Sequence, residues 1–364
     1  MIRRSPGGRG LPGCGENRFR LHPPLVERHT FRATDGQFQD PASHFPPGLT
    51  LQKGLVQRSS GMQEGSGNFG SETGSADGAF HSPPTSESGP ADVAGVRKVL
   101  AVEFIRRMRG GSQPFLMGCD DGQTYVVKFR NNPQHVRILA NETLASRLAM
   151  LIRLPVPGRA FVQVSQSLIS GTPLLKFETA GGEEKCAAGL HFGSRFPGAP
   201  SQTLVVDFLP DRLLRRVTNL ASIFLGAYAL DKWTCNCDGR QVIFYRTIEQ
   251  SGTRYSATLI DHGFCFNDGE WNFPDSPIRS LYPRRLVYES VRGLQSFEPY
   301  LSRIENIEAS ELEACLREVP PDWCGDDPQQ LSRLVERLYE RRRRVRQLII
   351  DAKQSSLRPF PNWD

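Results

Sequence analysis

The stretch Leu230-Asp231-Lys232-Trp233-Thr234-Cys235-Asn236-Cys237-Asp238 is the part of this 364-residue sequence from which fold and chemistry are best predicted. It ends a strongly apolar run with helical spacing, and four residues separate Asp231 from Asn236. Further on, Leu259-Ile260-Asp261-His262-Gly263 puts another carboxylate at the end of an apolar run. A carboxylate that ends so apolar a helix is expected near the core, where it needs a metal ion, a hydroxyl or a lysine as partner.

The chain upstream of this stretch begins with a predicted series of strands. A glycine-rich turn separates the first two, and an Asp-Gly pair predicts a hairpin between the second and third. The expected strands are 99–105, 114–119 and 124–129. In the third strand, alternation puts Val127 and Phe129 on one face and Val126 and Lys128 on the other.

A helix is predicted next, over 133–151, from apolar residues spaced three and four apart. Glu142 lies off the centre of its apolar stripe. Taken alone, Lys128 is interpreted as a surface lysine and Glu142 as a solvated helix residue. Because one follows the other from strand to helix, we expect an ion pair between them, with Glu103 as a weaker alternative partner.

The remaining pattern predicts an α+β protein. Residues 165–200 indicate loops with short elements. The other expected strands are 160–164, 204–209, 241–245 and 255–260, and the other expected helices are 220–231, 283–292, 297–306, 309–317 and 327–353. We therefore expect a β-rich lobe with one long helix over 93–209, a mostly helical lobe over 210–364, and a cleft between them.

Residues 1–92 differ from the rest in composition. They are dense in Gly, Pro, Ser and Arg, and their apolar residues have no period, so we expect disorder. A regulatory tail and a wrongly assigned start, with Met62 as an internal candidate, both remain open.

Charge and cysteine content narrow the class of protein. The net charge of +6 is modest, and the run Arg341–Arg344 is interpreted as a solvated helix face, which does not favour a nucleic-acid partner. The eight cysteines form no C-x2-C pair and are expected to be reduced thiols. We find no apolar run of about 18 residues and no secretory signal, and we expect a cytoplasmic protein.

The polar residues fit phosphoryl transfer better than other chemistry. That reaction needs a cover over the phosphates, a cation, metal ligands and a group that orients the nucleophile. An Asp-x4-Asn followed by a strand-end Asp is the spacing in which kinases carry a base and two metal ligands. The motifs Gly-x-Ser-x-Gly, His-Glu-x-x-His and Gly-x4-Gly-Lys-Ser/Thr are absent from the sequence.

The motifs together resemble the HipA-like kinase domain, a bacterial relative of the protein kinases and the phosphatidylinositol 3-/4-kinases. The similarity extends from Val99 to Phe266. It is carried by Gly110-Gly111-Ser112-Gln113-Pro114, Tyr125-Val126-Val127-Lys128-Phe129, Asn141-Glu142, Leu230 to Arg240, and Ile260-Asp261-His262-Gly263.

The resemblance implies ATP and Mg²⁺ as cofactors and a role for each motif. Lys128, supported by Glu142, would contact nucleotide phosphates beneath the turn formed by Gly110, Gly111 and Ser112. Asp231 would be the catalytic aspartate, with Asn236 and Asp261 on magnesium. Adenine would lie against the segment that contains Val206, Asp207 and Phe208, and Ser112 is the nearest match to a serine that such kinases autophosphorylate.

The sequence thus predicts an ATP- and Mg²⁺-dependent phosphotransferase. On the resemblance alone, the acceptor is a protein Ser/Thr hydroxyl, and a lipid or small-molecule hydroxyl is the alternative. A different class is a catalytically silent, kinase-like binding module that serves a small regulatory partner. The oligomeric state is left open.

Overall fold

The computed structural model describes residues 95–247, 254–327 and 329–364. All of these belong to one compact unit, residues 82–364. The predicted tail, residues 1–92, lies outside the described residues.

The strands agree closely with the predicted ones up to residue 164 and again from residue 203. They are β1 (Lys98–Arg107), β2 (Phe115–Cys119), β3 (Thr124–Lys128), β4 (Arg159–Val164), β5 (Lys176–Thr179), β6 (Gly182–Lys185), β7 (Gly189–Arg195), β8 (Thr203–Val206), β9 (Gln241–Thr247) and β10 (Ser256–Ile260).

Most helices follow the strands, so the chain is mixed α+β with strands towards its N-terminus and helices towards its C-terminus. The α-helices are α1 (Arg137–Leu151), α2 (Gln166–Gly171), α3 (Asp211–Leu214), α4 (Leu220–Thr234), α5 (Tyr300–Glu305), α6 (Ala309–Arg317), α7 (Gln329–Arg341) and α8 (Val345–Gln354). The 3₁₀ helices are η2 (Arg285–Tyr288), η3 (Leu294–Phe297), η4 (Pro321–Trp323) and η5 (Arg342–Arg344). No helix among the described residues is long and apolar enough to cross a membrane.

Five strands close into a barrel in the order β1-β2-β3-β7-β4, with β1 and β4 parallel. Alternation along β3 acts as predicted: Val127 and the residue after the strand, Phe129, are fully buried in the barrel core. Lys128 therefore points away from the barrel interior. The sequence does not indicate β7 because its glycines and serine have low strand propensity.

A second sheet has the strand order β10-β9-β8. The start of β9 and the end of β10 lie next to each other in this sheet. In the hairpin β9–β10, Gln241 pairs with Ile260. Continued by one residue, this register places Arg240 beside Asp261. The hairpin thus returns the end of β10 to the residues that follow α4.

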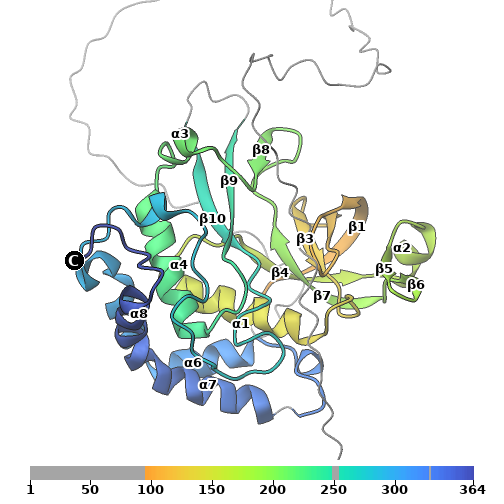
Figure 1. Cartoon of the computed structure of the whole chain (residues 1–364). Helices are drawn as coiled ribbons and strands as arrows, with labels where there is room; N and C mark the ends of the chain where they lie inside the picture. Colours follow the sequence, from red (N-terminus) through yellow and green to blue (C-terminus); the bar gives the residue numbers. More distant parts are fainter. Residues whose placement is uncertain (1–94, 248–253, 328) are drawn as a thin grey trace, which may run out of the picture. The chain divides into compact units, whose positions relative to one another are not determined.

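Helix α4 runs through the middle of the helical core. From Ile223 to Thr234 every residue is buried, and the indole of Trp233 donates to the Leu338 carbonyl of α7 at 2.9 Å. Helix α1 contacts β7 as well as α4 and α6, so it lies between the barrel and the helices, as Figure 1 shows. The position of α1 explains why most of its residues are buried instead of a single stripe.

Two helix predictions are wrong in extent. Over 283–292 the structure forms only η2, which begins after Arg284, a residue in an extended conformation with φ −122° and ψ 109°. The predicted helix 327–353 is interrupted by η5. At this break Arg341 and Arg342 are buried, whereas Arg343 and Arg344 are exposed, so only the second half of the basic run is the solvated face that the sequence predicts.

We predict that Gly193→Ala lowers the free energy of unfolding by roughly 1–3 kcal/mol, because an added methyl overpacks a barrel strand. A Cβ at Gly193 would lie 2.5 Å from Cγ2 of Val162, which is fully buried. Thermal or urea unfolding measures the effect. Gly171→Ala is the control, since a Cβ there meets nothing within 4 Å. Equal stability of the two variants would contradict this account of the barrel.

Candidate active site

Lys128 joins three elements that are far apart in the sequence. Its ammonium donates to Oε1 of Glu142 on α1 at 2.5 Å and to Oδ1 of Asp261 after β10 at 2.7 Å. The Lys128 and Glu142 side chains are 11% and 4% exposed, whereas that of Asp261 is 23% exposed. The predicted pair of Lys128 and Glu142 is therefore present, and Asp261 joins it through Lys128.

Burial and charge act against each other in this group. Burial lowers the pKa of Lys128, but the carboxylates of Glu142 and Asp261 outweigh it and raise the pKa above its usual value. Burial alone would raise the pKa of Asp261, but Lys128 outweighs burial and holds this pKa below its usual value. The Glu142 pKa stays raised because its desolvation exceeds the effect of Lys128. Lys128 and Asp261 are thus held in their charged forms.

These side chains are among the residues that line a cavity of about 150 Å³. Its polar lining residues include Lys128, Glu142, Asp261 and His262. Its apolar lining residues include Val126, Phe192, Ile243 and Leu259. A lining that combines apolar side chains with a few charged ones is typical of sites for small molecules.

The glycine-rich turn borders this cavity without lining it. Met108 and Pro114, on either side of the turn, are lining residues, whereas Gly110, Gly111 and Ser112 are not. Ser112 is only 4% exposed. The autophosphorylation predicted for Ser112 would thus require the turn to open.

The predicted adenine-binding segment lies partly at the cavity. Val205 lines it, and Asp207 and Phe208 line an adjoining hollow that shares Gln241 and Ile260 with it. The Phe208 ring is largely exposed and has the Arg284 guanidinium 5.0 Å from its centroid. Val206, at the end of β8, is partly buried against the core and lines neither space.

Asp231 and Asn236 are close to each other, but neither is among the described residues that line the cavity. The Asp231 side chain is 0% exposed, and both its oxygens accept from Arg240: Oδ2 from Nε at 3.0 Å and Oδ1 from Nη2. The Asn236 side chain also hydrogen-bonds Asp231, and its Oδ1 accepts from the Asp238 amide at 3.3 Å. Burial raises the Asp231 pKa, while Arg240 and then Asn236 oppose that shift.

Arg240 is the site residue that the sequence prediction missed. Its Nη1 also donates to the carbonyls of Ile260 and Asp261, at 3.2 and 3.4 Å, and lies 3.2 Å from Nδ1 of His262. The predicted hairpin could have revealed Arg240. Pairing its two strands places Arg240, which precedes the first strand, beside Asp261, which follows the second. Arg240 therefore contacts both acidic motifs.

The backbone that follows β10 has an unusual conformation. Asp261 has φ 57°, in the left-handed region that Asp tolerates better than most residues. The next amide, of His262, donates to the carboxylate of Glu142. His262 is buried, and burial together with nearby Arg240 holds its pKa well below the usual value, so its ring is neutral. We therefore interpret His262 as a structural residue.

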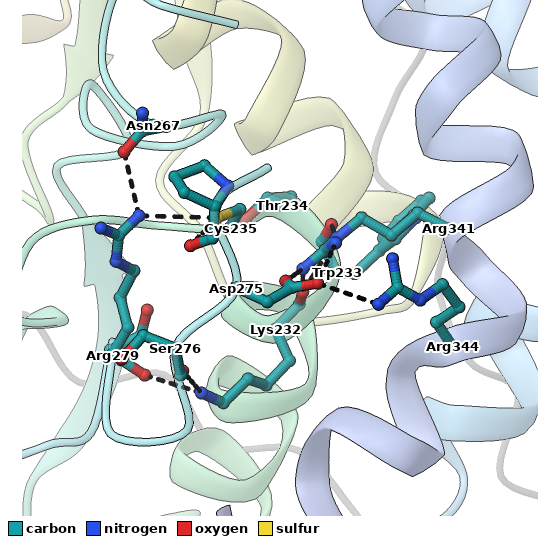
Figure 2. A network of polar contacts seen from close by, with 12 residues as sticks. Lys232, Trp233, Thr234, Cys235, Asn267, Asp275, Ser276, Arg279, Arg341 and Arg344 are labelled. Atoms are coloured by element: carbon teal, nitrogen blue, oxygen red, sulfur yellow. Dashed lines mark hydrogen bonds and ion pairs between the residues drawn. The ribbon is translucent and has the colours of Figure 1, made fainter. Parts of the chain in front are cut away.

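A second polar network supports the end of α4 (Figure 2). Arg341 donates to the carbonyls of Lys232 and Trp233 and pairs with Asp275, which also pairs with Arg344 at 3.0 Å. The Lys232 ammonium donates to three backbone carbonyls, those of Ser276, Pro277 and Arg279. Lys232 and Arg341 therefore make structural contacts, and these contacts stabilise the end of α4 that contains Asp231.

A lysine that pairs with a helix glutamate beside a cavity is one of the features that protein kinases share. The family model of HipA-like kinases matches residues 101–348, more than half of the chain. The chain belongs to the HipA-like kinase family, as the sequence resemblance predicted.

Two solved structures, both of kinases, give further similarities. The Golgi casein kinase is 12% identical, with a TM-score of 0.41 over 72% of this chain and 75% of that one. The Helicobacter pylori proinflammatory kinase CtkA is 12% identical, with a TM-score of 0.40 over 72% of this chain and 100% of that one. A comparison with curated proteins finds no match.

We predict that Lys128→Met destabilises the chain more at pH 8 than at pH 5. Without the ammonium, Glu142 and Asp261 face each other largely buried, so both carboxyl pKa values rise above the unfolded values of about 3.9–4.3. A raised carboxyl pKa favours folding below the unfolded pKa, and this contribution is lost as the pH rises through the folded pKa.

Chemical denaturation at the two pH values measures the effect, and the loss of stability relative to wild type should grow by roughly 1–3 kcal/mol between them. Lys176→Met is the control, because Lys176 pairs with Glu183 at a site where both side chains are more exposed. A loss for Lys128→Met that is independent of pH would contradict this description of the site.

Proposed function

We propose that this chain is an ATP- and Mg²⁺-dependent phosphotransferase whose acceptor is a protein Ser/Thr hydroxyl. Membership of the HipA-like kinase family supports phosphoryl transfer. The observation that carries the proposal is that the Lys128 ammonium lies 2.5 Å from Glu142 and 2.7 Å from Asp261, and that all three residues line the cavity.

The proposed role of Lys128 is to neutralise phosphate oxygens of the nucleotide. Glu142 orients the ammonium and holds it charged, so no side-chain rearrangement is needed when an anion arrives. In the reaction the bond between the terminal phosphorus and the oxygen of the leaving ADP breaks, and a bond from that phosphorus to the acceptor oxygen forms. The proton of the acceptor hydroxyl passes to Asp231 if Arg240 releases it, and otherwise to water. A positive charge fixed beside the phosphates favours this transfer.

The donor set near Asp261 fits magnesium held jointly with phosphates. Among the described residues, no group of three His, Cys, Asp or Glu side chains could hold a metal unaided. Mg²⁺ typically takes one or two carboxylates and completes its shell with water and phosphate oxygens. Asp261 is the proposed carboxylate, and the ion would supply neutralisation of the triphosphate. Asn236 is the second proposed ligand, and its side chain would have to turn away from Asp231 to take that role.

The apolar part of the cavity is the proposed place for the adenine ring. The volume of about 150 Å³ is below the ~300–1,000 Å³ of typical ligand sites, so a nucleotide would also extend into the adjoining hollow. That extension would bring it to Asp207 and Phe208, which line the hollow, but not to Val206, which lines neither space. In this proposal residues 93–209 and 210–364 act as two lobes, and the nucleotide lies between them.

A second candidate is a kinase-like module without turnover, as a binding partner of a small regulatory protein. One observation favours it: the carboxylate of Asp231, predicted to deprotonate the acceptor, is fully buried and occupied by Arg240. Two roles therefore remain for Asp231 in an active enzyme, as a base once Arg240 releases it or as the fixed partner of Arg240. A lipid or small-molecule hydroxyl remains the alternative acceptor.

We predict that the whole chain, with Mg²⁺ and labelled ATP, binds nucleotide and transfers phosphate to itself or to a Ser/Thr peptide mixture. Lys128→Met and Asp261→Asn should each lower the rate by about 10²-fold or more, because each removes charge that stabilises the transferring group. Asp327→Asn is the control, since its partner Arg333 lies in an exposed pair.

A nucleotide-dependent shift in melting temperature without turnover would favour the binding module. The absence of any such shift would overturn both candidates. Transfer to lipid or to small hydroxyl compounds in place of peptide would identify the alternative acceptor.

A further inference from the structure

Arg240 uses every nitrogen of its guanidinium, and it uses them on two different segments. Nε and Nη2 bind the carboxylate of Asp231 near the end of α4. Nη1 binds the carbonyls of Ile260 and Asp261, and lies 3.2 Å from Nδ1 of His262. The Arg240 side chain is 1% exposed, so these bonds form away from water, where they are strong and sensitive to geometry.

Asp231, in turn, has no free oxygen directed at the cavity. Both oxygens are bound to Arg240, and the side chain is 0% exposed. A general base has to come within hydrogen-bond distance of the proton that it removes. In this arrangement Asp231 reaches no acceptor, but it fixes the plane of the guanidinium.

The guanidinium plane determines where the backbone of Asp261 lies. Two consecutive carbonyls, including that of Asp261, accept from Arg240, while the Asp261 carboxylate accepts from Lys128 at 2.7 Å. The left-handed φ of 57° at Asp261 turns the side chain towards Lys128 although the carbonyl faces Arg240. The residue is thus held from both sides.

We propose that Asp231 and Arg240 form a positioning pair for the reaction, in which Asp231 orients Arg240 and Arg240 fixes the backbone that aims Asp261 at magnesium and the phosphates. This inference rests on the proposed function. It assigns Asp231 an indirect role, and it adds Arg240 to the residues on which activity depends.

A double-mutant cycle separates this role from that of a base. Asp231→Asn should lower kcat about tenfold or more in the chain with Arg240, but less than about threefold in a chain that already carries Arg240→Gln. A general base would instead lose about 10²–10⁴-fold in both backgrounds. Equal losses in the two backgrounds would overturn the proposal.

The metal dependence gives a second signature in the same assays. Because the pair acts on Asp261, Arg240→Gln should raise the Mg²⁺ concentration needed for half-maximal rate several-fold, and Asp231→Asn in that background should add little. Removing one partner leaves a buried charge unpaired, so a single variant could fail to fold. Asp231→Asn with Arg240→Gln keeps a neutral, hydrogen-bonded pair, and this folded double variant should retain more than about 1% of the wild-type kcat.

Amide hydrogen exchange tests the positioning without any need for turnover. Asp231→Asn and Arg240→Gln should each speed exchange in a peptide that covers 259–263, relative to the core of α4. The control is Glu318→Gln, which breaks another buried ion pair, with Arg159 at 2.5 Å, and should leave that peptide unchanged. Unchanged exchange in 259–263 on loss of Arg240 would overturn the inference. A wild-type chain that neither binds nor turns over ATP would overturn only the proposed function.

Discussion

The rest of the site depends on the two ion pairs that the Lys128 ammonium makes. The ammonium neutralises Glu142 from α1 and Asp261 from the end of β10, and it reaches both from the end of a barrel strand. Removing it would leave two mostly buried carboxylates without a counter-ion, which is far more costly than losing an exposed pair. The barrel, helix α1 and the second sheet are therefore joined at one point, where a single positive charge compensates two carboxylates.

A second buried cation, Arg240, also joins separate elements of the fold. Arg240 joins the end of α4 to the end of β10, as Lys128 joins β3 and α1 to the same place. Asp261 belongs to both groups, through its side chain in one case and its carbonyl in the other. The Arg341 network fixes the carbonyl end of α4 behind them. The Arg341 contacts restrict the end of α4, and the Arg240 contacts restrict the backbone of Asp261. The Asp261 carboxylate would therefore need little reorganisation to bind a cation.

The features that sequence could predict are those in which local pattern and function coincide. Strand alternation placed Lys128 opposite Val127, and chain order placed Glu142 within reach. Burial of Asp231 against Arg240 could not be predicted, because an Asp at a helix end has the same spacing whether it faces a cavity or an arginine. Strand β7 was missed because its barrel position allows glycine where a Cβ would clash. Arg341 was misjudged because charge alone does not reveal a break in a helix.

We propose that the cavity beside Lys128 binds the phosphates and metal of ATP. A crystal structure of the chain with a non-hydrolysable ATP analogue and Mn²⁺, located by its anomalous signal, tests this most directly. The account predicts an ion within about 2.0–2.3 Å of an Asp261 carboxylate oxygen and triphosphate oxygens in contact with the Lys128 ammonium. Nucleotide and manganese bound elsewhere, with Lys128 still contacting only Glu142 and Asp261, would contradict it.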